Sequence, residues 1–269
     1  RWPASDQLKS WGLLPHRPDW AGGLRATWVP GEASAMSRLT SFLDDGLSHY
    51  REARDRPDTE GTSRLSPHLA FGEISPRQIW RAVTANEMSP MAEKFMSEIG
   101  WREFAYHLLY HFPTTPDEPL RPEFAAMDYD EPGPLLDAWK EGRTGFPIVD
   151  AGMRQLLATG WMHNRVRMIT ASFLTKDLHV WWPHGARHFL DHLLDGDIAS
   201  NSHGWQWVAG TGTDASPYFR VFNPITQGIR FDPHGDYVRR WVPELAHVEG
   251  AAVHEPWLLL DGLAQGYPE

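Results

Sequence analysis

The stretch VDAGMRQLL, residues 149–157, carries apolar side chains at Val149, Met153, Leu156 and Leu157. This spacing of three and four residues places them on one face of a helix. Two further apolar stripes follow the same period: Met36, Leu39, Leu43 and Leu47 with Phe42 and Tyr50 alongside, and Ile169, Phe173 and Leu174. Alternating strand patterns are hard to find. The sequence therefore predicts an all-α fold, with residues 1–269 as one helical domain.

Serine-proline pairs predict where two of these helices begin. Ser66-Pro67 and Ser75-Pro76 each place a hydroxyl at the N-cap position before a proline at the first helical position. Proline-containing loops are expected at residues 112–119 and 130–134. From residue 243 onward the chain mixes proline, glycine and short apolar groups, which predicts a surface-wrapping tail.

Composition excludes several classes of protein. The chain has 269 residues, 41% hydrophobic and 22% charged, so it can bury a core and is not typical of a disordered protein. It has no cysteine, which excludes disulfides, thiol nucleophiles and cysteine-based metal sites. Its longest apolar run, Trp257 to Leu260, is far below the roughly 18 residues of a membrane span. The net charge of −10 means that any contact with DNA requires a local basic patch.

Two motifs resemble functional sites only superficially. Residues 210–215 fit a loose dinucleotide-binding pattern, but no strand precedes them and Ser216-Pro217 interrupts any following helix. His184, His188 and His192 share a helix face, yet no acidic partner completes a zinc motif. We interpret them as ordinary surface or capping histidines, and we expect no metal site.

Three clusters carry chemistry. Glu98, Trp101 and Arg102 place a carboxylate, an indole and a guanidinium on one helix face. The second cluster puts Asn164, Arg167 and Met168 on one face and turns Arg165 away. The third, residues 195–207, combines closely spaced carboxylates with two indoles.

Six collinear stretches resemble the photolyase and cryptochrome family: residues 61–67, 101–104, 145–151, 160–168, 195–207 and 211–223. The match covers nearly the whole chain and is similar to the C-terminal helical FAD-binding domain of class I cyclobutane pyrimidine dimer photolyases. It implies that residues 1–30 are a linker-derived start, and that an N-terminal α/β domain carrying an antenna pigment is absent from this chain. It also implies a monomer that acts in the cytoplasm, at the nucleoid when bound to DNA, without a membrane.

The resemblance implies FAD as cofactor, active in its reduced anionic form. The hydroxyls of Thr62, Ser63 and Ser66 would meet the diphosphate at a helix start. Arg167 would pair with Asp195, and the amide of Asn201 would accept from the protonated flavin N5. The full set of cofactor-binding residues expected from the resemblance is Tyr50, Thr62, Ser63, Arg64, Leu65, Ser66, Arg102, Arg167, Asp195, Gly196, Asp197 and Asn201.

The implied activity is light-driven repair of cyclobutane pyrimidine dimers in UV-damaged DNA, by electron transfer from excited reduced FAD, which makes the chain a carbon–carbon lyase. The dimer must leave the duplex stack, which costs a few kcal/mol. Residues expected to face it, in catalytic roles, are Glu98, Trp101, Asn164, Met168 and Trp207. Residues expected to contact DNA are Arg54, Glu98, Trp101, Arg102, Asn164, Arg165 and Gln227.

A separate relay would carry electrons from the surface to oxidised flavin. By resemblance, Trp205 and Trp182 are its first two members. Tyr129 stands where the family usually has a third tryptophan, so the relay would end in a tyrosyl radical or use another nearby aromatic. Phe95 stands where the family often has tryptophan, one helical turn before Glu98.

Three alternatives remain open. A (6-4) photolyase needs a histidine where this chain has Asn164, and the adjacent His163 should point elsewhere. A cryptochrome-like blue-light sensor often replaces the N5-facing asparagine, whereas Asn201 stands here, and adds a long C-terminal extension, whereas the chain stops at Glu269. A flavin-free nucleic-acid-binding module would purify without a visible absorption band.

Overall fold

Helices account for almost all regular structure in the computed structural model, which describes residues 2–85, 88–216 and 220–268. The first group is α1 Gly22–Thr27, α2 Glu32–Ser41, α3 Tyr50–Ala53, α4 Ser66–Ala70, α5 Pro76–Thr84 and α6 Pro90–His111. The second is α7 Pro134–Glu141, α8 Pro147–Thr159, α9 Asn164–Ser172, α10 Trp182–His192, α11 Ile198–Ala209, α12 Pro224–Phe231 and α13 Asp236–Trp241. Within those ranges the β-structure amounts to one isolated bridge between Asp130 and Val180. The predicted all-α fold is confirmed.

One of the two predicted serine caps is present. Ser75 forms a capping box with Gln78 at the start of α5. Ser66 instead lies inside α4, after Leu65, and makes no capping hydrogen bond. The prediction for Ser66 is wrong because Arg64 adopts a positive φ of 50° and Leu65 already has helical angles, so Ser66 is helical itself and cannot take the extended conformation of a serine cap.

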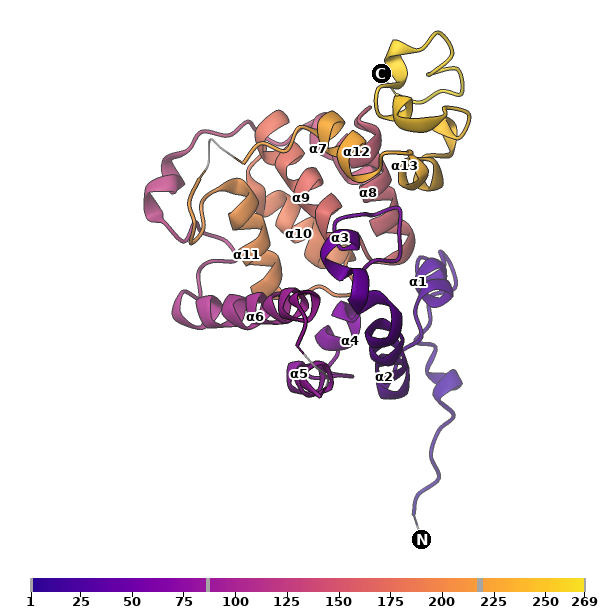
Figure 1. Ribbon diagram of the computed structural model, residues 1–269, viewed down its shortest axis with the longest axis vertical. Helices are drawn as coiled ribbons and strands as arrows, with labels where there is room; N and C mark the ends of the chain where they lie inside the picture. The colour runs from indigo at the N-terminus through magenta and orange to yellow at the C-terminus, as the bar shows by residue number, and fades with distance from the viewer. Residues whose placement is uncertain (1, 86–87, 217–219, 269) are drawn as a thin grey trace.

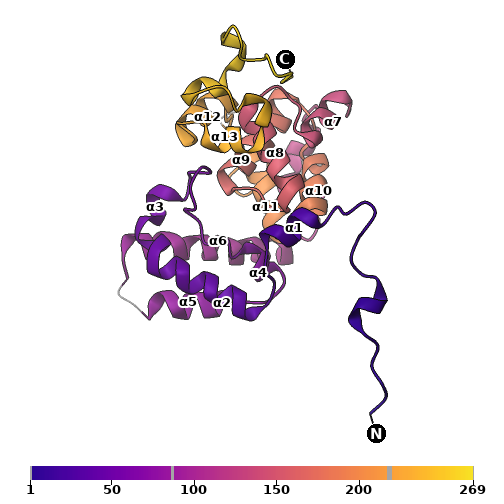
Figure 2. The ribbon, with the colours of Figure 1, turned by 90° about the vertical axis from the view of Figure 1, so that its right-hand side faces the viewer.

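The helices form two groups (Figure 2), and each group has its own hydrophobic core. The first lies among α2 to α6 and includes Leu39, Ile79 and Phe95. The second joins α7 to α11 and α13 around Trp139 and Trp182, both fully buried. The long helix α6 packs on α11 and so connects the two (Figure 1). Val149, Met153 and Leu156 of the first predicted stripe lie in the second core, whereas Leu157 of that stripe and Met36 of the other are exposed.

The two ends of the chain behave differently. The segment before α1 extends away from the helices and exposes its tryptophans (Figures 1 and 2). The C-terminal segment turns through short 3-10 helices and buries Leu245, Val248, Val253 and Tyr267 in the second core. It is therefore more than the surface-wrapping tail predicted, because these side chains complete the packing beside α8 and α13. None of the helices described has the length and apolar character needed to cross a bilayer.

Candidate active site

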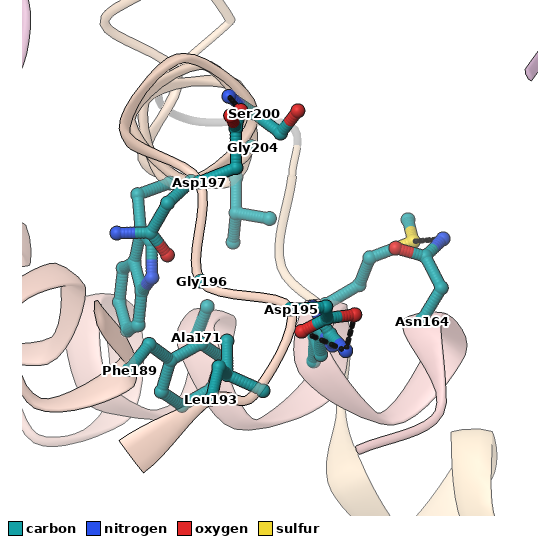
Figure 3. A pocket seen from close by; sticks show the side chains of 14 residues that line it. Asn164, Ala171, Phe189, Leu193, Asp195, Gly196, Asp197, Ser200 and Gly204 are labelled. Atoms are coloured by element: carbon teal, nitrogen blue, oxygen red, sulfur yellow. Dashed lines mark hydrogen bonds and ion pairs between the residues drawn. The ribbon is translucent and has the colours of Figure 1, made fainter. Parts of the chain in front are cut away.

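An open cavity of about 390 Å³ lies between α3, α4 and α6 on one side and α9 and α11 on the other. Ligand sites commonly measure about 300–1,000 Å³. A second cavity, of about 170 Å³, adjoins it and shares Asn164, Arg167, Asp195 and Asp197 with it (Figure 3). Phe189 and Leu193 give the smaller cavity an apolar wall. The two cavities together offer a polar region and an apolar region.

The segment from Gly61 to Ser66 forms the polar wall of the larger cavity. A Cβ at Gly61 would lie 2.4 Å from the Ala53 carbonyl oxygen, so only glycine lets the chain pass there. Thr62, Ser63, Arg64, Leu65 and Ser66 then all line the cavity. Their hydroxyl groups and one guanidinium are donors suited to an anionic group.

Aromatic contacts fix two further parts of this wall. The Arg64 guanidinium lies 4.8 Å from the centre of the Trp161 ring, and its Nη2 donates to Glu60 at 2.9 Å. Tyr50 is buried and meets the rings of Phe42 and Phe95 edge to face. Tyr50 also lines the cavity, as the sequence predicted for a cofactor-binding residue.

The ion pair predicted between Arg167 and Asp195 is present. Nη2 of Arg167 donates to both Asp195 carboxylate oxygens, at 2.8 and 3.1 Å (Figure 3). Nε of Arg167 donates to the Met162 carbonyl oxygen at 2.8 Å. The Asp195 carboxylate is almost completely buried. The pair therefore fixes one cation and one anion at the junction of the two cavities.

Asp197 connects the two cores. It caps α11 by accepting from the Ser200 backbone N–H at 2.7 Å, and it also accepts a hydrogen bond from the Tyr106 hydroxyl of α6. Arg102 donates to the same hydroxyl at 3.3 Å. Sequence reasoning missed Tyr106, although its position four residues after Arg102 on one helix was a usable signal.

The amide of Asn201 has a defined orientation. Its Nδ2 donates to the Ala186 carbonyl oxygen of α10 at 2.9 Å, and the residue lines the smaller cavity. Because the nitrogen is engaged with the backbone, the amide oxygen is the group left to accept a hydrogen bond from a bound molecule. This orientation agrees with the acceptor role predicted from the sequence.

Glu98 lies in an ion-pair network at the edge of the larger cavity. It accepts from Arg54, and Lys94 lies 2.9 Å away. Partial burial alone would raise the pKa of the Glu98 carboxyl, but the two cations outweigh burial and hold that pKa below its usual range. Glu98 is therefore ionised at neutral pH.

Trp101 presents a partly exposed indole at the same edge. Its ring is nearly parallel to that of His203, with centres 6.3 Å apart, and meets Phe104 edge to face. His203 also lines the cavity and was missed by sequence reasoning. On α9, Nδ2 of Asn164 approaches Sδ of Met168 at 3.9 Å, and both line the smaller cavity.

Three of the residues predicted to face the dimer or contact DNA line neither cavity: Trp207, Arg165 and Gln227. Trp207 stacks on Phe222, with ring centres 6.2 Å apart, beneath the guanidinium of Arg220. Residues two apart on a helix lie about 200° apart around its axis, so α11 cannot turn Trp205 and Trp207 to the same side. Gln227 lies on α12, away from both cavities. These placements give no support to the predicted contacts of Trp207 and Gln227. Of residues 211–223, positions 217–219 lie outside the described residues.

Trp205 lines the smaller cavity and is buried. Its ring centre lies 5.0 Å from Phe189 and 6.1 Å from Trp139. A Cβ at Gly185 would come within 2.2 Å of the Trp205 ring, so the glycine lets α10 approach it closely. Trp182, also on α10, is fully buried.

A backbone hydrogen bond of the neighbouring Asp130 holds Tyr129 close to the segment that precedes α10. The Asp130 N–H donates to the His179 carbonyl oxygen at 2.9 Å, and the Tyr129 ring lies 5.7 Å from that of His179. Burial raises the pKa of the Tyr129 hydroxyl, which has no hydrogen-bond partner within the described part of the chain. Loss of its proton is therefore unfavourable in this position.

The histidines confirm one prediction and correct another. His163 caps α9 by accepting from the Arg165 N–H at 3.2 Å; burial lowers its pKa to about 4, and it lines neither cavity. It therefore points elsewhere, as predicted. His188 is buried against Trp139, so its interpretation as a surface or capping residue is wrong. Across the described ranges, no group of three or more potential ligand residues could hold a metal ion.

These features define a helical cofactor-binding protein, with donors for an anionic group at one end of its cavity and aromatic and apolar walls at the other. Residues 95–269 match the FAD binding domain of DNA photolyase. The chain is 51% identical, over 95% of its length, to the deoxyribodipyrimidine photo-lyase of Agrobacterium fabrum, of which the match covers 54%. The chain belongs to the photolyase/cryptochrome family.

Solved structures agree with this assignment. A bacterial class III photolyase from Agrobacterium tumefaciens superposes with a TM-score of 0.92 at 49% identity, covering 100% of this chain and 57% of that one. A cryptochrome from Synechocystis gives a TM-score of 0.82 at 34% identity, covering 90% and 53%. The chain spans about half the length of the relatives it matches.

Proposed function

We propose that this chain forms the catalytic part of a deoxyribodipyrimidine photo-lyase, which uses FAD and light to repair cyclobutane pyrimidine dimers in DNA. The observation that carries the proposal is one continuous site. It combines the hydroxyl-rich segment 62–66, the Arg167–Asp195 pair and the inward-facing amide of Asn201 with an open edge formed by Trp101. Two relatives named deoxyribodipyrimidine photo-lyase, 51% and 48% identical in sequence to this chain, support the same activity.

The residues present fit FAD. Segment 62–66 would hold the diphosphate by hydroxyl and guanidinium donors, and the Asn201 amide oxygen would accept from the flavin N5–H. Asp195, held by Arg167, would bind polar edges of the cofactor. When bound in its reduced anionic form, FAD supplies the light-excited electron that opens the dimer and recovers it afterwards.

The chain's own groups would bind and orient the damaged DNA. The exposed indole of Trp101 offers a stacking surface for a base that has left the duplex. Asn164, Met168 and the ionised Glu98 would contact the dimer, and Arg54, Arg102 and Arg165 would meet phosphates. Such a local patch explains how a chain with a net charge of −10 could bind DNA.

The test is a repair assay on an oligonucleotide with one defined cyclobutane thymine dimer, using protein with reduced FAD. We expect dimers to disappear under blue or near-ultraviolet light and to persist in the dark. Persistence of the dimer in the light would contradict the proposal.

We expect Asp195→Asn to weaken FAD binding by about tenfold or more, because it leaves the Arg167 guanidinium without its buried partner. The measurement is the dissociation constant from flavin absorbance or fluorescence. Asp191→Asn removes the same charge from an exposed site on α10 and serves as the control. Equal FAD affinity in the two variants, with equal far-UV circular dichroism, would contradict this role.

Two observations bear on the alternatives. The (6-4) activity is disfavoured because Asn164 lines the cavity and His163 does not. A blue-light sensor is the second candidate, because one of the solved structures with a similar fold is a cryptochrome. If the purified protein bound flavin but repaired no dimers in the assay above, that result would favour the sensor. The solved photolyase from Agrobacterium tumefaciens that this chain resembles is a class III enzyme, so it does not support the predicted class I assignment, which stays a prediction. Monomeric state, cytoplasmic location and an antenna pigment also stay predictions.

A further inference from the structure

One carboxylate lies between the two arginines proposed to meet DNA phosphates. Asp55 follows α3; its Oδ1 lies 3.7 Å from Nε of Arg54, and its Oδ2 lies 3.0 Å from Nη2 of Arg165 on α9. Arg54 directly follows α3, which packs in the first core, whereas Arg165 lies on α9, which packs in the second, so Asp55 forms a bridge between the two groups of helices. No role for Asp55 emerged from the sequence.

The surroundings leave both guanidiniums little freedom. Arg54 also pairs with Glu98 and lies 5.6 Å from the centre of the Tyr50 ring, and its side chain is only 16% exposed. Arg165 lies 4.4 Å from the centre of the Phe231 ring, and its side chain is 18% exposed. With each guanidinium packed over a ring, the carboxylate sets where their free N–H groups point.

The charge of Asp55 has a second effect. Two guanidiniums within ion-pair distance of one carboxylate would repel each other without it. The same negative charge also repels a phosphate that approaches the pair, on a damaged or an undamaged strand. A strand whose extruded lesion fills the cavity is held in register with the two oriented guanidiniums, so it gains more from their fixed orientation than undamaged DNA, which binds through its backbone charge alone.

We infer that Asp55 is a specificity-determining positioning residue: it fixes Arg54 and Arg165 relative to each other and reduces the affinity for undamaged DNA. This inference rests on the proposed function, because it requires that the two arginines bind DNA. Asp55 itself touches neither the cofactor cavity nor the dimer in this scheme.

The test compares Asp55→Asn with the unchanged protein, both carrying FAD, on one oligonucleotide with and without a dimer at several salt concentrations. We expect the variant to bind undamaged DNA about three- to tenfold more tightly, which is the effect of one unit charge about 4 Å from a phosphate when water screens the pair as in bulk solvent. Binding to dimer-containing DNA should not tighten in proportion, because the arginines are less well oriented. The ratio of the two affinities should therefore fall.

Asp45→Asn is the matched control, since it removes the same charge from an exposed site that has no ion pair within the described residues. Asp55→Glu, which keeps the carboxylate, should restore part of the ratio. If Asp55 had only a structural role, Asp55→Asn would weaken the binding of both DNAs to the same extent and would lower the flavin absorbance per mole of protein. The inference would be overturned if the ratio of affinities for damaged and undamaged DNA were the same in Asp55→Asn as in the unchanged protein or in Asp45→Asn. The proposed function would remain intact. Failure of the unchanged protein to distinguish the two DNAs would overturn both.

Discussion

Replacing Trp205 by phenylalanine is expected to slow the light-driven reduction of bound, oxidised FAD by about a hundredfold, equivalent to a barrier higher by about 2.7 kcal/mol. Trp205 is the one indole that lines the smaller cavity among the residues described, and it is buried there beside Phe189. A phenylalanine fills most of the same space but is far harder to oxidise than an indole. The measurement is the loss of flavin absorbance during illumination with an external electron donor.

The same experiment distinguishes two routes for the next electron. Trp182 is the predicted second member, but the structure also brings the ring of Trp139 to within 6.1 Å of Trp205, centre to centre. Both indoles are fully buried. If the predicted route holds, Trp182→Phe slows reduction strongly and Trp139→Phe does not. The reverse result would assign the second step to Trp139.

Tyr129 is the weakest member of the predicted relay on physical grounds. Its hydroxyl is buried, burial raises its pKa, and it has no hydrogen-bond partner among the described residues. The partly exposed Trp181 lines the same surface cavity of about 270 Å³ as Tyr129 and needs no proton loss to form a cation radical. Transient absorption of Tyr129→Phe with unchanged radical yield and lifetime would remove Tyr129 from the relay. Equal photoreduction in Trp205→Phe and the unchanged protein would contradict the relay altogether.

The helical fold could be predicted because the apolar period is a local property. Val149, Met153 and Leu156 occupy one face whatever packs against it, and Ser75 caps α5 through contacts within one turn. Ser66 shows the limit of this reasoning. Its place relative to the helix depends on the left-handed conformation of Arg64, which the sequence pattern does not encode.

The candidate site shows the same difference between features that the sequence predicts and features that depend on tertiary packing. The Arg167–Asp195 pair was predicted only through the family resemblance, since 28 positions separate the two residues. Contacts between the two cores were missed: Tyr106 with Asp197, Trp101 beside His203, and Asp55 with Arg165. Each depends on how α6 and the segment after α3 dock against α9 and α11, which is a tertiary property.

The pairing of Glu98 gives a structural reason for an effect that the sequence already predicts, a larger loss of repair yield than of DNA affinity when Glu98 is replaced by alanine. Its carboxylate neutralises part of the charge of Arg54 and Lys94 while lining the cavity where the dimer would bind. Glu98→Ala therefore removes a predicted hydrogen-bond partner of the dimer and, at the same site, releases two cations toward DNA phosphates. Affinity and repair should therefore respond differently.

We expect Glu98→Ala to lower the repair yield per absorbed photon by about tenfold, close to the effect of removing one charge-assisted hydrogen bond. Its affinity for dimer-containing DNA should stay within about threefold of the unchanged protein, because the stronger attraction between the released cations and the phosphates offsets the missing hydrogen bond to the dimer. Both quantities are measured on the same oligonucleotide, by binding titration in the dark and by dimer disappearance under a calibrated lamp. Glu93→Ala, at an exposed position of α6, removes a carboxylate without touching the cavity and is the control. An equal fall in affinity and yield would show that Glu98 acts only in binding.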